Sequence, residues 1–192
     1  TMMNGSGLNP NSFTQSWANS SVSSLPMVYA NMFLPMPGDT NKYLLLHMTV
    51  DDNAINATAS SLFFSIVDIQ LDSGRGQVIS KNQVVYNNTL SWGIAACKHA
   101  NGRDWWLIKP HQWRQSFYTF LVTPDSIQGP FEQQIPFDMS GLDEFTNGLK
   151  PGEKIWGIFG QITASPDGNW LATTESSYEG VFTYKFDRCS GT

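Results

Sequence analysis

Short apolar runs separated by glycine turns recur three times along the chain. Each copy consists of an apolar run, a turn that contains glycine, and a second run that begins at or near an aromatic residue. The turn glycines are Gly38, Gly102 and Gly168, and they lie 64 and 66 residues apart (102 − 38 and 168 − 102). Two apolar runs joined by such a turn predict a β-hairpin. The nearly constant interval indicates that the hairpin belongs to a larger unit that is repeated.

The apolar runs predict about four short strands in each repeat. The last run alternates clearly, since Phe182, Tyr184 and Phe186 fall on one side of an extended strand and the residues between them on the other. Residues 1–26 are rich in Asn, Ser and Gly, and we interpret them as an extended lead-in that crosses the surface or closes a sheet edge. The expected strands are 27–34, 43–50, 62–71 and 78–86, then 90–97, 105–109, 117–123 and 129–137, and finally 154–163, 170–174 and 181–186.

This organisation predicts an all-β fold made of β-propeller blades. Four-stranded antiparallel sheets that repeat along the chain are typical of such blades. A β-sandwich also uses short alternating strands, but the constant interval between hairpins favours blades. Because an ordinary blade takes roughly 40–50 residues, the longer repeats here require insertions at their outer edges. We therefore divide the chain into a lead-in, residues 1–26, and a partial propeller of about three blades, residues 27–192.

A propeller of three blades is expected to need further polypeptide. Propellers normally close with four to eight blades, so three blades leave apolar faces and strand edges that favour association. The aromatic side of residues 181–186 is expected to be one of these open faces. We expect the remaining propeller blades, or another protein chain, to cover them. The isolated chain is accordingly expected to be marginally stable or to self-associate.

Composition and charge narrow the classes of partner. Aromatic residues make up 13% of the chain and charged residues 14%, which favours a folded, β-rich body. The net charge is −5, and no run of Lys or Arg occurs. Nucleic acids and anionic membranes both require clustered positive charge, so we expect neither as a partner. No apolar stretch approaches the ~18 residues of a membrane-spanning helix.

The second hairpin carries a family resemblance. Its sequence is Lys98-His99-Ala100-Asn101-Gly102-Arg103-Asp104-Trp105-Trp106. With residues 90–97 before it, this stretch resembles the large secreted, WD40-like β-propeller proteins of gliding Bacteroidetes, which use the type IX secretion pathway. The similarity covers residues 27 to 191 and includes 65–68, 81–84, 165–168 and 186–191. The resemblance implies a propeller fold and a secreted or cell-surface location, and it implies no particular activity.

Cys97 and Cys189 are the two cysteines of the chain. In an exported protein an even number of cysteines suggests a disulfide, which here would close a loop of 92 residues (189 − 97). The alternative is that they are two separate, small, buried apolar residues in different blades. Both interpretations stay open at this point. Two cysteines and three scattered histidines do not form the closely spaced ligand set of a zinc site, so we predict no metal and assign no cofactor.

The second hairpin turn holds a group of ionisable residues. His99, Arg103 and Asp104 lie together there and resemble an acid–base cluster. Asn and Asp in hairpin turns, however, usually accept hydrogen bonds from turn amides, so we favour a structural role. The residues that we assign to structural turns are Asn101, Gly102, Asp104, Asp167 and Gly168.

Trp113, with its neighbours His111 and Arg114, is the best candidate for a ligand-binding site. These residues follow Pro110 in a polar loop, where we expect both rings to be exposed. By contrast, His47 lies inside an apolar run and is expected in the core. The same expectation holds for the tryptophans in or beside strands, which are Trp92, Trp105, Trp106, Trp156 and Trp170.

The sequence contains neither the Gly-x-Ser-x-Gly elbow of many hydrolases nor a Gly-x-x-x-x-Gly-Lys phosphate loop. We assign no catalytic residue and predict an exported, non-catalytic binding or assembly module, with surface carbohydrate as one candidate ligand. Two alternatives remain: a propeller hydrolase acting on a polysaccharide or lactone, and a structural subunit of a surface fibre or complex. Carboxylates or histidines that converge on the central channel would favour the hydrolase. An exposed aromatic strip would favour ligand binding.

Overall fold

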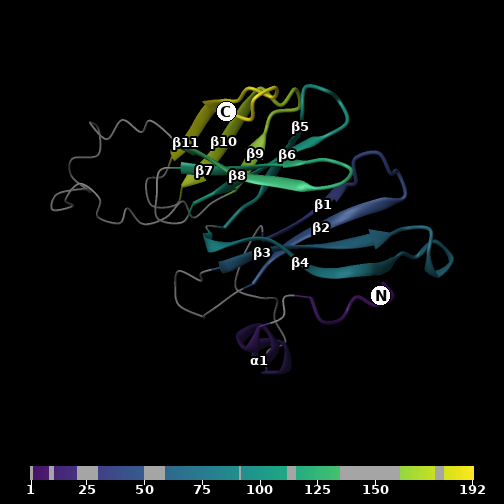
Figure 1. Cartoon of the computed structure of the whole chain (residues 1–192). Coiled ribbons are helices and arrows are strands. Elements are labelled where there is room, and N and C mark those ends of the chain that lie inside the picture. The colour runs from purple at the N-terminus through teal and green to yellow at the C-terminus, as the bar shows by residue number, and fades with distance from the viewer. Residues whose placement is uncertain are drawn as a thin grey trace.

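The computed structural model describes residues 2–8, 11–20, 30–49, 59–90, 92–111, 116–134, 161–175 and 180–192. Within these residues the chain forms eleven strands in three antiparallel sheets, one α-helix and one short 3-10 turn, η1 (Asp72–Gly74). The prediction of an all-β fold made of blade-like sheets is therefore confirmed. The three sheets lie one above another as successive layers (Figure 1).

Sheets A and B are four-stranded meanders, in which each strand pairs with the next one along the chain. In sheet A the order is β1 (Asn31–Pro35), β2 (Lys42–Met48), β3 (Ala59–Asp68) and β4 (Gln77–Leu90). In sheet B it is β5 (Ala95–Lys98), β6 (Trp105–Pro110), β7 (Ser116–Val122) and β8 (Ile127–Gln134).

Sheet C has three strands in the part of the chain that the structure describes, where the sequence predicts about four per repeat. They are β9 (Ile162–Ala164), β10 (Trp170–Glu175) and β11 (Gly180–Lys185), with β10 in the middle. Most of the predicted strand 154–163 lies outside the described residues. The boundary between the first two repeats also differs from the prediction, because Leu90 closes β4 and Gly93, at φ 74°, separates β4 from β5.

The three predicted hairpin turns are present. Gly38, Gly102 and Gly168 adopt φ values of 78°, 76° and 73°, the left-handed region that favours glycine. The second and third turns are built alike, since in each the glycine amide donates to a carbonyl three residues earlier, His99 or Ser165. In the first turn it is the residue after Gly38 that donates, to Met36. The interval of 66 residues therefore joins equivalent positions, whereas the interval of 64 joins turns of different construction.

Sheet B is the middle layer, and its two faces contribute to two separate clusters of buried side chains. Its strands alternate between them: Leu107 faces sheet A, whereas Trp106 and Ile108 face sheet C. This explains why β6 and β7 read as continuous apolar runs, because strands covered on both faces bury every residue. The cluster between sheets A and B includes Leu34, Leu44, Leu46, Leu62, Leu107 and Phe120. The cluster between sheets B and C includes Cys97, Trp106, Ile108, Phe117, Ile162, Leu171 and Phe186.

The aromatic side of β11 faces sheet B. Tyr184 packs edge-on against Phe117, with ring centroids 5.4 Å apart, and Phe186 is buried in the same cluster. The predicted alternation along this strand is therefore confirmed. The expectation that its aromatic side is an open face is wrong, because β5, β6 and β7 of the preceding sheet already cover it.

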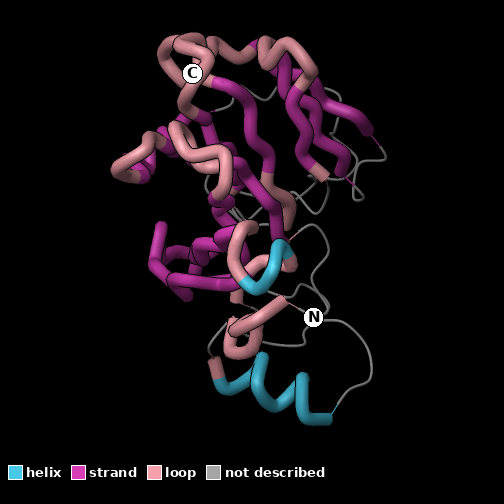
Figure 2. The backbone as a smooth tube through the Cα atoms, turned by 90° about the vertical axis from the view of Figure 1, so that its right-hand side faces the viewer, coloured by secondary structure: helices cyan, strands magenta, loops and turns pink. Residues whose placement is uncertain are grey.

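The N-terminal segment contains a helix that the sequence analysis did not predict. Helix α1 (Ser12–Ser20) lies beside sheet A, at the end of the molecule away from sheet C (Figures 1 and 2). It begins where the Asn11 side chain accepts a hydrogen bond from the backbone amide of Thr14 at 2.7 Å, a typical N-terminal cap. Before it, Met3 forms a parallel bridge with Gln77 of β4. Among the described residues, no helix is long and apolar enough to cross a membrane.

Candidate functional site

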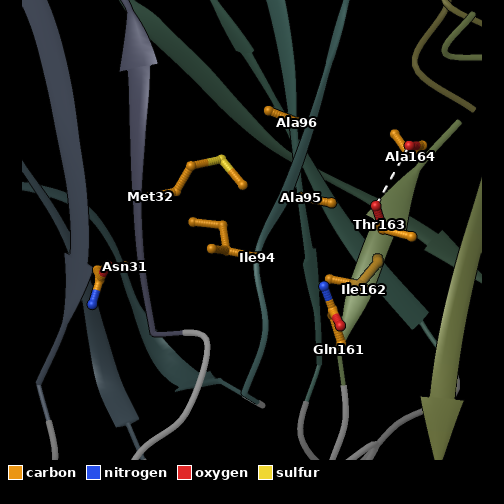
Figure 3. A pocket seen from close by; sticks show the side chains of 9 residues that line it. All are labelled: Asn31, Met32, Ile94, Ala95, Ala96, Gln161, Ile162, Thr163 and Ala164. Atoms are coloured by element: carbon orange, nitrogen blue, oxygen red, sulfur yellow. Dashed lines mark hydrogen bonds between the residues drawn. The ribbon is translucent and has the colours of Figure 1, made fainter. Parts of the chain in front are cut away.

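The edge strands β1, β5 and β9 of the three sheets surround a cavity of about 280 Å³ (Figure 3). Each is the first strand of its sheet, so the repeat itself brings them together. Met32 and Ile94 are drawn between β1 and β9 in this view. The nine lining residues are Asn31, Met32, Ile94, Ala95, Ala96, Gln161, Ile162, Thr163 and Ala164. We call this space the axial cavity.

The lining of the axial cavity combines apolar side chains with uncharged polar ones. Asn31 and Gln161 carry amides that both donate and accept hydrogen bonds, and Thr163 carries a hydroxyl, bonded to the Ala164 carbonyl at 3.5 Å. Because β1, β5 and β9 are sheet edges, each also presents backbone groups that its sheet does not pair. None of the nine described residues that line the cavity is ionisable. Such a surface suits an uncharged polar ligand better than acid–base chemistry.

A buried lysine lies beside the axial cavity. Lys109 of β6 has no exposed surface, and its Nζ donates to the Gly93 carbonyl at 2.6 Å. Gly93 directly precedes Ile94, which lines the cavity, so this bond fixes the start of β5. Burial holds the pKa of Lys109 well below its usual value, because desolvation penalises the charged amine. The sequence analysis missed Lys109; the signal was a single cation inside an otherwise apolar run.

Polar and aromatic side chains around Lys109 connect sheets A and B. Tyr118, the partner of Lys109 in the register of β6 and β7, packs against Tyr86 of β4 with ring centroids 4.9 Å apart. Asn88 of β4 donates to the hydroxyl groups of both tyrosines, at 3.2 and 3.3 Å. Since Tyr118 and Asn88 come from different sheets, this network fixes how the two layers meet.

His111 belongs to the same network, which corrects its predicted exposure. It forms a backbone bridge to Leu90, and its ring lies 5.3 Å from the ring of Tyr118. The residue is buried, because the chain after Pro110 continues the sheet for one more pair, in which the His111 amide donates to the Ser116 carbonyl. It is therefore not an exposed binding residue. Trp113 and Arg114, the other two residues of the predicted binding site, lie outside the described residues.

The turn of residues 99–104 has the geometry of a structural element. Asn101 accepts the backbone amides of Arg103 and Asp104 at 3.0 Å, and its own side-chain amide donates to Asp104 at 2.7 Å. The guanidinium of Arg103 donates to both carboxylate oxygens of Asp104, at 2.8 and 3.0 Å. The hydrogen bond from Arg103 lowers the pKa of Asp104. Asn101 and Arg103, which donate to this carboxylate, both lie within the turn, so the cluster organises the hairpin.

The third turn is held in a related way. The Asp167 carboxylate accepts hydrogen bonds from the Ser165 hydroxyl and from the backbone and side-chain amides of Asn169. Gly168 allows a close approach as well as a turn, because an added Cβ would lie 2.6 Å from Arg188 and 3.2 Å from Cys97. This contact joins the third hairpin to the second sheet.

Cys97 and Cys189 are free thiols in the structure, so the disulfide that the sequence left open as one of two interpretations is not formed. Cys97 is buried between sheets B and C, whereas Cys189 is exposed. Burial raises the pKa of the Cys97 thiol to about 11, although the nearby Arg188 opposes the shift. Within the described ranges, no group of three or more His, Cys, Asp or Glu residues could hold a metal ion.

Trp170 departs from the expectation that strand tryptophans lie in the core. It is 44% exposed, on the face of sheet C that points away from sheet B. Trp106, at the other extreme, is buried and donates its indole N–H to the Arg188 carbonyl at 2.9 Å. Sequence patterns alone do not show which of these two tryptophans is buried, because both lie at the start of a strand that follows a glycine turn, Trp106 as its second residue and Trp170 as its first. Trp156 lies outside the described residues.

Comparison with solved structures finds the Kuenenia stuttgartiensis hydrazine synthase, with a TM-score of 0.37 and 15% sequence identity. The similarity covers 81% of this chain and 45% of the synthase chain, so this chain spans less than half of that chain's length. No family model and no curated protein matches the sequence. At this level of similarity the comparison assigns neither an activity nor a ligand.

Proposed function

We propose that this protein is an exported, non-catalytic binding module built on blade-like β-sheets. The observation that carries the proposal is the axial cavity, whose nine described lining residues supply two amides and a hydroxyl beside apolar side chains, with no ionisable group among these nine. Concave sites of this composition bind ligands through shape and a few placed hydrogen bonds. The resemblance of residues 90–106 to secreted propeller proteins supports the export.

The proposal is tested by asking whether the cavity binds an uncharged ligand. Ligand-observed NMR with a set of uncharged amides and polyols is compared between the wild type and the double variant Asn31→Ala/Gln161→Ala. Both side chains are exposed, so the fold should survive. Loss of two hydrogen bonds should weaken binding about tenfold or more. The control Gln70→Ala removes an exposed amide far along the sequence from the cavity and should bind as the wild type does.

The rival hypothesis is a hydrolase, and it makes a different prediction. Chromogenic glycosides, esters and lactones should not be turned over by the wild type. Turnover that disappears in the Asn31→Ala/Gln161→Ala variant would overturn the non-catalytic assignment. If no uncharged probe binds the wild type more tightly than it binds the double variant, the axial cavity is not the binding site.

The assembly partner that we propose is a further propeller blade or another protein chain on sheet A. The face of sheet A that points away from sheet B exposes Phe33 and Val84. Apolar side chains grouped on one face commonly mark an interaction surface. Sedimentation of the wild type should show self-association that Phe33→Ser/Val84→Ser weakens; a monomer at all concentrations would count against this partner.

A further inference from the structure

The outward face of sheet C, the face away from sheet B, differs in chemistry from the equivalent face of sheet B. The two sheets share one register. Cys97 pairs with Trp106, which pairs with Leu121 on the next strand. Thr163 and Ala172, each 66 residues later than Cys97 and Trp106, pair in the same way, and Ala172 pairs with Thr183 on the next strand. The apolar row Cys97, Trp106 and Leu121 in sheet B thus corresponds in sheet C to two threonines and one alanine. Because packing against another sheet requires large apolar residues, this row fits a solvated face.

Trp170 stands on this polar face at the edge of a shallow depression of about 390 Å³. Lys185, its partner in the register of β10 and β11, places Nζ 5.8 Å from the centre of the indole ring. The depression is lined by Asn169, Trp170, Lys185, Phe186, Asp187 and Thr192, and it shares no residue with the axial cavity. An aromatic ring is therefore surrounded by an amide, an amine and a carboxylate.

Short hydrogen bonds hold the backbone around the depression. The Trp170 amide donates to the Ser165 hydroxyl at 3.0 Å, and the Phe186 amide donates to the Asn169 carbonyl at 2.8 Å. The Asp187 carboxylate accepts the Cys189 amide at 2.8 Å and the Ser190 hydroxyl at 3.0 Å. These bonds fix the backbone that carries Trp170 and Phe186, and the Asp187 carboxylate, before any ligand arrives, which lowers the ordering cost of binding.

We propose that this surface, centred on Trp170, binds a neutral saccharide. The electron-rich face of an indole attracts polarised C–H groups, which line one side of many pyranose rings. The amide, amine, carboxylate and threonine hydroxyls around it supply donors and acceptors for sugar hydroxyls. One cation and one anion leave the surface without net charge, so it suits an uncharged sugar better than an anionic one. The exposed threonines Thr163, Thr174 and Thr183 continue the polar surface of sheet C beyond Trp170, where a chain of several sugar units could extend.

The test uses soluble hexasaccharides of β-1,4-linked glucose, xylose and N-acetylglucosamine as probes, with isothermal titration calorimetry and tryptophan fluorescence. At least one probe should bind the wild type and change its fluorescence. Trp170→Ala should weaken that binding about tenfold or more, and Trp170→Tyr should restore part of it. The control Ile69→Ala removes another exposed apolar side chain, 41% exposed and outside both proposed surfaces, and should leave binding unchanged.

Three outcomes would overturn the proposal. The first is that none of the three hexasaccharides binds. The second is equal binding by Trp170→Ala and the wild type. The third is that Trp170→Ala abolishes self-association while no sugar binds, which would make the surface a protein interface. The double variant Asn31→Ala/Gln161→Ala should bind the hexasaccharide as the wild type does. The saccharide surface is thus tested by the Trp170 variants and the axial cavity by the double variant, so that either proposal can fail without the other.

Discussion

Sheets B and C start from the same hairpin, yet sheet B is buried on both faces and sheet C on one. Their registers coincide, with Lys98 opposite Trp105 in sheet B and Ala164 opposite Leu171 in sheet C. The residues of sheet B that point toward sheet C are large and apolar, whereas the equivalent residues of sheet C are small or polar. The hairpin therefore sets strand pairing, while the number of covered faces sets the amino-acid pattern. Four predictions test how far this difference extends.

The largest expected effect is at the two tryptophans. Trp106→Ala should lower the free energy of unfolding by about 3–5 kcal/mol, because it opens a cavity beneath Gly191 and beside Phe131. Trp170→Ala should change it by less than about 0.5 kcal/mol, because the ring is 44% exposed and lies on the outward face of sheet C. Urea denaturation measures both. If Trp106→Ala does not fold, Trp106→Phe should show a smaller loss in the same direction; equal losses at positions 106 and 170 would contradict the comparison.

The next effect concerns pH and the buried cation of sheet B. The pKa of Lys109 is lowered in the folded state, whereas in the unfolded chain it has its usual value of 10.5. At pH values just below 10.5 the unfolded chain therefore binds more protons than the folded chain. The free energy of unfolding should therefore rise as pH increases toward that value and fall as pH decreases, by up to about 1.4 kcal/mol per pH unit. Lys109→Met should remove this dependence in denaturation curves measured between about pH 7 and about pH 10.

Lys185→Met provides the matched control on the open face of sheet C. The side chain of Lys185 is exposed, so its removal should leave the wild-type pH dependence in place. If the free energy of unfolding depends on pH equally in the wild type and in Lys109→Met, the pKa of Lys109 does not differ between the folded and unfolded states.

A smaller effect is expected from exchanging equivalent residues on the third strand of each sheet. Leu121 and Thr183 occupy corresponding places opposite Trp106 and Ala172. Leu121→Thr should cost about 2 kcal/mol, because it removes apolar contact from the cluster between sheets B and C. Thr183→Leu should be neutral to within about 0.5 kcal/mol. Thermal unfolding compares the two; a stabilising Thr183→Leu that also drives association would indicate a second buried face on sheet C.

The smallest effect is expected in the turns. Asp104→Ala should lower the free energy of unfolding by about 1–2 kcal/mol, because Asn101 and Arg103 lose the buried carboxylate that they contact. Asp167→Ala, in the equivalent but exposed turn, should have a smaller effect. Binding to the probes described above should persist in both variants; loss of binding without loss of stability in Asp104→Ala would make this turn a functional site.

The hairpins and their spacing could be predicted because their signals are local. A glycine with positive φ, a polar turn and two apolar runs occur within about a dozen residues, and so Gly38, Gly102 and Gly168 are found where expected. Helix α1 escaped prediction because its cap at Asn11 is a single side chain in a polar segment. His111 was misplaced because a polar residue after a proline resembles a loop, whereas its burial depends on Tyr118 and Leu90, which lie elsewhere in the chain.

The candidate sites depended on contacts that no single segment carries. The axial cavity takes its lining from three strands that are far apart in the sequence, and each of them alone reads as an ordinary strand. Lys109 was missed, because a charge in an apolar run does not show by itself what it contacts, and its role became visible only with the Gly93 carbonyl. Trp106 and Trp170 both lie at the start of a strand after a glycine turn, and the packing of sheet C against sheet B buries Trp106 while Trp170 remains on the outward face of sheet C.

By itself the sequence determined the all-β class, the repeated hairpin and the two-residue alternation of β11, because turn chemistry and side-chain period act over short distances. The tertiary structure decided which face each strand buries, which edge strands meet at the axial cavity, and that the aromatic side of β11 turns toward Phe117. These features follow from the stacking order of the sheets. Stacking order depends on contacts between residues that are far apart in sequence, and a period of two marks the faces of a strand without saying what lies against them.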